Sequence, residues 1–115
     1  MKRVLVVDDE KALGRLLAHA LAMEGYVADT ADDGVKALRH LEQHACDLLI
    51  TDYNMPEMDG LELTRQVRSR FPSVPILVVT GDGPLDVLMK SGATACVEKP
   101  VPLDKLLGLV KNILA

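Results

Sequence analysis

The stretch from Leu48 to Pro56 constrains the fold of this chain more than any other. Apolar residues Leu48 to Ile50 lead through Thr51 to Asp52, and a turn that ends in Met55-Pro56 follows. Proline cannot donate a ladder hydrogen bond and disfavours helix at the residue before it, so we expect the strand to end near Asp52. A continuous apolar run is typical of a strand in a parallel sheet that is covered on both faces. Asp52 is therefore predicted at the carboxyl end of a central strand, where open α/β sheets bind ligands.

Changes in the spacing of apolar residues predict four more strands and five helices. The other strands are Val4–Val7, Val27–Thr30, Val74–Val79 and Ala93–Val97. The helices start near Lys11, Asp32 or Asp33, Gly60, Leu85 and Pro102, and the fourth, Leu85–Lys90, is short. Strict alternation predicts an α/β fold of three layers, a doubly wound (βα)5 with a five-stranded parallel sheet. The most apolar strands belong in the middle, which gives the order 2-1-3-4-5.

Apolar residues at helical spacing predict the buried face of each helix. These are Leu13, Leu16, Leu17, Ala20 and Leu21, then Val35, Leu38 and Leu41, then Leu63 and Val67, and finally Leu103, Leu106, Leu107, Val110 and Ile113. Gly25 is expected to end the first helix in a left-handed conformation. We interpret the third helix's arginines, Arg65, Arg68 and Arg70, as a solvated face.

Composition limits the classes of function that are open to this chain. Its 115 residues predict one domain, residues 1–115. A net charge of −4 argues against direct binding of nucleic acid, and no apolar run is long enough to cross a membrane. Met1-Lys2-Arg3 leads into too few apolar residues for a signal peptide. The two cysteines, Cys46 and Cys96, cannot form a disulfide scaffold, so we expect a cytoplasmic location.

Five residues are predicted to meet at the carboxyl ends of the strands, and these are Asp8, Asp9, Asp52, Thr80 and Lys99. Three clustered carboxylates repel one another and favour a hard cation such as Mg²⁺, which prefers oxygen ligands. The three negative charges of the carboxylates equal the two positive charges of Mg²⁺ and the one positive charge of Lys99. Such a site can accept a phosphoryl group beside a carboxylate.

Asp52 is the natural nucleophile of this predicted site. A carboxylate is ionised at neutral pH and needs no general base, and aspartyl-phosphate is an established covalent intermediate. Thr80 can donate its hydroxyl to a phosphoryl oxygen, and Asn54 can offer its backbone carbonyl to the metal. Taken singly, a turn, a helix cap or a solvated lysine explains each residue; their coincidence at successive strand ends favours the functional interpretation.

The chain resembles the receiver domain of two-component response regulators over essentially its whole length. The motifs that carry the resemblance are Val6-Val7-Asp8-Asp9-Glu10, Asp52-Tyr53-Asn54-Met55-Pro56-Glu57-Met58-Asp59-Gly60, Val79-Thr80-Gly81 and Lys99-Pro100. The resemblance implies a phosphoacceptor signalling domain, which catalyses only its own phosphorylation and dephosphorylation and is no enzyme otherwise. The phosphoryl donor would be a sensor histidine kinase or phosphotransfer protein, and a downstream protein target or a fused output domain would receive the signal.

The resemblance also implies roles for individual residues. Asp52 would be the phosphoacceptor, and Asp8, Asp9, Asp52 and the Asn54 carbonyl would bind Mg²⁺. Lys99 would pair with the phosphoryl group, and Thr80 would move toward it. Lys99-Pro100 would form the family's cis peptide bond.

Two features depart from the family pattern. Cys96 occupies the position three before the lysine, where an aromatic switch residue is usual. The segment from Thr80 to Lys99 is also shorter than is usual in the family, by about one helical turn of 3.6 residues. We therefore hypothesise that output uses an altered surface, on the first or the last helix.

Two other functions are open. A pseudo-receiver would keep the fold and signal without phosphate, as Cys96 and the short fourth helix would allow. A haloacid-dehalogenase-type phosphatase also uses an aspartyl-phosphate, and Thr80-Gly81-Asp82-Gly83 resembles a metal-loop motif of its relatives; however, Glu10 stands where its second aspartate would be.

Two smaller features have a functional and a structural interpretation. His40 and His44 are spaced for a metal on one helix, but the sequence brings no third ligand near them, and a solvated face is the simpler interpretation. A redox role for Cys96 competes with a buried small hydrophobe, which we favour because Cys46 is expected near the opposite end of the sheet.

Overall fold

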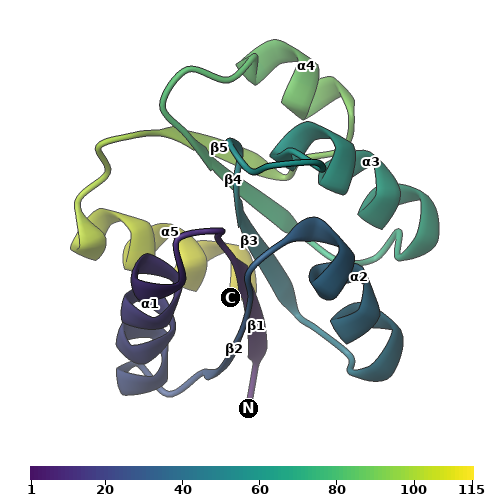
Figure 1. Ribbon diagram of the computed structural model, residues 1–115. Helices are drawn as coiled ribbons and strands as arrows, with labels where there is room; N and C mark the ends of the chain where they lie inside the picture. Colours follow the sequence, from purple (N-terminus) through teal and green to yellow (C-terminus); the bar gives the residue numbers. More distant parts are fainter.

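The computed structural model describes all 115 residues, with five strands and five helices in strict alternation (Figure 1). The strands are β1 (Arg3–Val7), β2 (Val27–Ala31), β3 (Leu48–Asp52), β4 (Ile76–Thr80) and β5 (Ala95–Glu98). The helices are α1 (Lys11–Met23), α2 (Gly34–Gln43), α3 (Gly60–Arg70), α4 (Leu85–Lys90) and α5 (Leu103–Leu114). None of the helices is long and apolar enough to cross a membrane.

The strands form one parallel sheet in the order β2-β1-β3-β4-β5, which confirms the predicted topology. Helices cover both faces, with α1 and α5 on one side and α2, α3 and α4 on the other (Figure 1). Successive side chains of a strand point to opposite faces, so each central strand contributes side chains to two apolar cores, one on each face of the sheet. In β1, Val4 and Val6 pack toward α1 and α5, whereas Leu5 and Val7 pack toward the other helices. The apolar run before Asp52 has the same cause, because Leu49 belongs to one core and Leu48 and Ile50 to the other.

Side-chain caps fix where two of the helices start. Asp33 caps α2 by accepting a hydrogen bond from the Lys36 backbone N–H at 2.8 Å, which decides between the two aspartates that the sequence offered. Asp59 caps α3 in the same way through the Glu62 N–H at 2.9 Å. Gly25 has a φ of 96° after α1, as predicted.

Four apolar residues predicted to be buried are exposed instead. Val35, Leu13, Leu16 and Leu103 are 46–62% exposed. In α1 the buried face consists of Gly14, Ala18 and Leu21. Helical spacing identifies apolar faces, but it does not decide which of two such faces meets the sheet.

The last two strands begin two residues later than predicted. The Ile76 N–H donates to the Thr94 hydroxyl at 3.0 Å, and the Ala93 N–H donates to the Leu88 carbonyl within the turn after α4. Residues 93 and 94 therefore belong to that turn, and strand pairing begins at Leu77 with Ala95.

Arg68 corrects the interpretation of the α3 arginines as a solvated face. Its Nε and Nη2 donate to the Gly92 carbonyl at 3.1 and 2.6 Å, and its Nη1 donates to the Pro72 carbonyl at 2.7 Å. Gly92 follows the short α4 and has a φ of 115°. Arg68 therefore ties α3 to both neighbouring connections.

Replacing Arg68 with Ala should lower the free energy of unfolding by about 1.5–3 kcal/mol, because hydrogen bonds from a charged donor are lost and the Gly92 carbonyl loses its partner. Urea unfolding measures the change. Arg65→Ala on the same helix is the matched control, because Arg65 is exposed, and it should shift stability by less than about 0.5 kcal/mol. Equal effects of the two substitutions would contradict a specific role for Arg68.

Candidate functional site

Three carboxylates meet at the carboxyl edge of the sheet. Asp8 and Asp9 follow β1, and Asp52 is the last residue of β3. These strands are neighbours with Val7 opposite Thr51, and one oxygen atom of each carboxylate lies within 4.8 Å of those of the others. They form the only such group of three metal-binding side chains in the chain.

Backbone hydrogen bonds extend beyond the strands and fix the site's loops. The Asp8 N–H donates to the Ala31 carbonyl at 3.1 Å, and the Tyr53 N–H donates to the Val79 carbonyl at 3.0 Å. The Lys99 N–H donates to the Thr80 carbonyl at 2.8 Å. The structure thus brings all five predicted residues to one edge.

Lys99 forms an ion pair with Asp52. Its Nζ lies 2.7 Å from Asp52 Oδ1, and the Asp52 side chain is only 7% exposed. Burial opposes the charged form of the lysine, but the hydrogen bond and charge of Asp52, with the charges of Asp8 and Glu10, outweigh it and raise the pKa of Lys99. Lys99 is therefore charged at neutral pH.

The surroundings of Asp8 disfavour its charged form. Its Oδ1 accepts a hydrogen bond from the Glu10 N–H at 2.9 Å. Partial burial, with the charges of Asp52 and Asp9, raises the pKa of Asp8, although the Glu10 hydrogen bond and Lys99 oppose the shift. An additional positive charge at the cluster would relieve this repulsion.

The donor set of the cluster fits Mg²⁺. All three side chains offer carboxylate oxygens, which hard divalent cations prefer. A single lysine leaves the three carboxylates with a net negative charge. Asp8, Asp9 and Asp52 could therefore hold one such ion.

Thr80 is buried and its hydroxyl is bonded to the loop that follows β4. Thr80 Oγ1 accepts hydrogen bonds from the Gly83 N–H at 2.6 Å and the Asp82 N–H at 3.3 Å. The hydroxyl proton remains available for an acceptor at the site. Any displacement of Thr80 must therefore break these bonds or move the loop.

Tyr53 and Gly83 are site residues that the sequence analysis did not identify. A Cβ at Gly83 would lie 2.6 Å from Thr80 Oγ1 and 3.0 Å from Cγ of Tyr53. Asn54 Nδ2 also donates to Asp82 Oδ1 at 3.2 Å. The glycines around Asp82 indicated a loop, but no sequence signal could show which side chains it packs against.

Cys96 lies on β5 opposite Val78, half-buried against the core beneath α2, α3 and α4. Burial raises the pKa of its thiol and so disfavours the reactive thiolate. Cys46, which precedes β3, is also a free thiol, and burial raises its pKa too. The Lys99-Pro100 peptide bond is cis, as the resemblance implied.

His40 is not part of a solvated face. Its side chain is 19% exposed and its Nε2 lies 3.2 Å from Asp29 Oδ2 on β2. The rings of His40 and His44 are 4.9 Å apart between centroids. The Asp29 carboxylate of the neighbouring strand contacts His40, and helix spacing alone could not reveal that contact.

The chain is a doubly wound α/β domain with an acidic cluster, a lysine and a threonine at the carboxyl edge of its parallel sheet. The profile of the response regulator receiver domain family matches residues 4–111. The chain therefore belongs to the response regulator receiver domain family.

Solved structures and curated sequences agree with this assignment. A CheY-like receiver domain protein from Methanospirillum hungatei superposes with a TM-score of 0.94 at 31% identity, covering 99% of this chain and 94% of that one. The response regulator TrrA from Thermotoga maritima, solved in complex with Mg(2+)-BeF, gives a TM-score of 0.90 at 36% identity, covering 99% and 100%.

Longer relatives contain a segment like this chain. The sensor histidine kinase RcsC from Salmonella typhi is 42% identical over 106 residues, which are 90% of this chain and 11% of the kinase. The response regulator MprA from Mycobacterium ulcerans is 37% identical over 115 residues, 97% of this chain and 50% of MprA. The chain thus spans half or less of the length of these relatives.

Asp8→Asn should stabilise the protein without Mg²⁺, because it removes one charge from the cluster and keeps the oxygen that accepts from Glu10. The gain should stay below about 1 kcal/mol, since Asp8 is partly exposed and solvent screens it. The pKa of Asp8 is higher in the folded protein than its ordinary value of 3.8. The free energy of unfolding of the wild type therefore falls, relative to that of Asp8→Asn, as the pH rises above 3.8. Thermal unfolding between about pH 3.5 and 7 measures this, with exposed Asp104→Asn as the charge control. A constant difference across that range would contradict the prediction.

Proposed function

We propose that residues 1–115 form a receiver domain in which Asp52 accepts a phosphoryl group from the phosphohistidine of a sensor histidine kinase or phosphotransfer protein. The observation that carries this proposal is the buried Asp52 carboxylate, paired with Lys99 at 2.7 Å and grouped with Asp8 and Asp9. A structural role alone does not account for three carboxylates gathered around one lysine. The likeness to TrrA and MprA supports the same reaction class.

Asp52 acts as the nucleophile in the proposed transfer. A carboxylate oxygen forms a bond to phosphorus while the phosphorus–nitrogen bond to the donor imidazole breaks, and the imidazole keeps that electron pair. The charged ammonium of Lys99 moves from the carboxylate to a phosphoryl oxygen. Thr80 donates a hydrogen bond from its hydroxyl group to another phosphoryl oxygen. The Asp8, Asp9 and Asp52 carboxylates, with the Asn54 backbone carbonyl, would hold Mg²⁺, which supplies positive charge beside the phosphoryl oxygens.

The proposed switch works through the loop after β4 instead of an aromatic residue on β5. Cys96 is too small to fill and vacate the volume of an aromatic ring. Thr80 Oγ1, in contrast, accepts N–H bonds from Asp82 and Gly83, and Tyr53 packs against the same glycine. Movement of Thr80 toward a phosphoryl group therefore displaces residues 81–84 and the Tyr53 ring.

The proposed partner surface lies on α1. Leu13, Leu16 and Met23 are 46%, 62% and 74% exposed on this helix. Their spacing places them along one side of it, away from the residues buried against the sheet. A protein target or a fused output domain can cover this side. Direct contact with nucleic acid or membrane is not part of the proposal, and the cytoplasmic location stays a prediction.

Acetyl phosphate with Mg²⁺ should add one phosphoryl group to the wild-type protein, because a small donor requires only the acceptor and its charged neighbours. Intact-mass spectrometry measures the adduct. Asp52→Asn should abolish it, and omission of Mg²⁺ should reduce it at least tenfold. Asp104→Asn, which changes the same charge on α5, should leave it unchanged.

The alternatives predict different outcomes. No adduct together with no stabilisation by Mg²⁺ would favour the phosphorylation-independent pseudo-receiver. Turnover of a generic phosphate ester that is lost in Asp8→Asn would favour the phosphatase. An adduct that persists in Asp52→Asn would refute Asp52 as the acceptor.

Thr80→Val should still form the adduct but should lose the response of the loop, because valine keeps the shape of threonine without its hydroxyl. ¹⁵N NMR spectra before and after phosphorylation measure amide shifts at residues 81–84 and Tyr53. Thr80→Ser is the matched control and should keep these shifts. Identical shifts in the valine variant would contradict the loop switch, and shifts confined to α4 and β5 would contradict an altered partner surface.

A further inference from the structure

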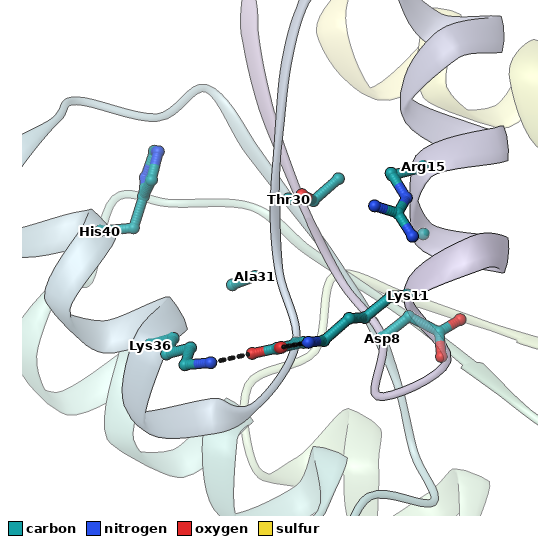
Figure 2. Close-up of a pocket in the computed structure, with 9 residues that line it drawn as sticks. Asp8, Lys11, Arg15, Thr30, Ala31, Lys36 and His40 are labelled. Carbon is teal, nitrogen blue, oxygen red and sulfur yellow. Dashed lines mark ion pairs between the residues drawn. The ribbon is translucent and has the colours of Figure 1, made fainter.

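A polar hollow lies at the β2 edge of the sheet, between the first turns of α1 and the facing side of α2 (Figure 2). Its volume is about 330 Å³ and Ala31 is its only apolar lining residue. Asp8 forms the wall toward the acidic cluster, whereas the remaining lining comes from α1, β2, α2 and the β2–α2 connection. The hollow therefore borders the phosphoacceptor site and shares Asp8 with it.

Three cationic side chains line this hollow although the chain as a whole carries a net charge of −4. Lys11 and Arg15 come from α1, and Lys36 comes from α2. Asp8 and Asp32 are the only acidic residues in the lining, so its formal charge is positive. A concave site with an excess of cations attracts anions.

Asp32 holds two of the cations in place. Its Oδ1 lies 2.7 Å from Lys36 Nζ, and its Oδ2 lies 3.3 Å from Lys11 Nζ. Each ammonium carries three N–H groups, so each keeps donors for a further acceptor. Figure 2 shows Lys11 and Lys36 extending toward each other from α1 and α2. The two exposed ammonium groups are therefore held near one carboxylate at the rim of the hollow.

Arg15 and Thr30 are exposed and supply donors that no other residue of the protein engages. Neither the Arg15 guanidinium nor the Thr30 hydroxyl forms a hydrogen bond or ion pair with another residue of the chain. Figure 2 shows Arg15 extending from α1 toward the strand that carries Thr30. Donors from α1, β2 and α2 therefore surround the same space.

We propose that this hollow binds a small molecule that carries a phosphate group. The planar guanidinium of arginine can donate two parallel hydrogen bonds to phosphate oxygens. The ammonium and hydroxyl donors approach from other sides, which suits the tetrahedral oxygens of a phosphate better than the planar oxygens of a carboxylate. Since a water molecule takes about 30 Å³ in the liquid, the hollow fits a ligand of about ten non-hydrogen atoms. The Asp8 wall places such a ligand beside the acidic cluster, where it can influence the charge of that cluster.

Pyrophosphate, which has a suitable size and charge, is the probe for a ¹⁵N NMR titration of the full chain without Mg²⁺ at constant ionic strength. Saturable amide shifts should centre on Lys11, Arg15, Thr30 and Lys36. Arg15→Gln should weaken binding at least about tenfold, the equivalent of one lost charge-assisted pair. Thr30→Val should weaken it less. Arg65→Gln on α3 is the matched control and should bind like the wild type.

Asp52→Asn separates this site from the phosphoacceptor site, because it should leave pyrophosphate binding intact whether or not phosphorylation occurs at Asp52. The proposal would be overturned by amide shifts that centre on Asp52 or that do not saturate. It would also be overturned if Arg15→Gln and Arg65→Gln weakened pyrophosphate binding equally. Citrate is the carboxylate comparison, and binding as tight as that of pyrophosphate would overturn the assignment to phosphate.

Discussion

Repulsion among Asp8, Asp9 and Asp52 is the constraint on which the organisation of the site depends. Two like charges 4 Å apart repel by about 1 kcal/mol in water and about 4 kcal/mol at the effective dielectric near a protein surface. The apolar strands β1 and β3 nevertheless bring these carboxylates to one edge, because burial of both strand faces fixes their register. Lys99, from the other end of the chain, supplies the compensating charge, so the electrostatics of the site require the complete sheet.

The fold could be predicted from the sequence because its three central strands are apolar on both faces and end in turn residues. Leu48 to Ile50 identified the central strand, and Met55-Pro56 fixed its end. Asp8, Asp52 and Lys99 could be predicted to meet because parallel strands of known order present their carboxyl ends on one side.

The remaining features depend on contacts that no local pattern encodes. Leu13 and Leu16 have core spacing, yet α1 turns Gly14, Ala18 and Leu21 toward the sheet. Arg68 resembles its exposed neighbours in sequence, and only the folded positions of the Gly92 and Pro72 carbonyls give it partners. Tyr53 packs near Gly83 across a loop, and Arg15 and Thr30 line one hollow although they come from different elements, so these relations exist only in three dimensions.

Arg68 also bears on how the molecule opens locally. A helix of six residues such as α4 has little stability of its own, because helix nucleation is costly and few hydrogen bonds repay it. The bond from Arg68 to Gly92 links the end of α4 to α3, which is buried by Leu63 and Val67. We therefore expect α4 to share a cooperative unfolding unit with α3, and its amide hydrogens to exchange with solvent more slowly than its length suggests.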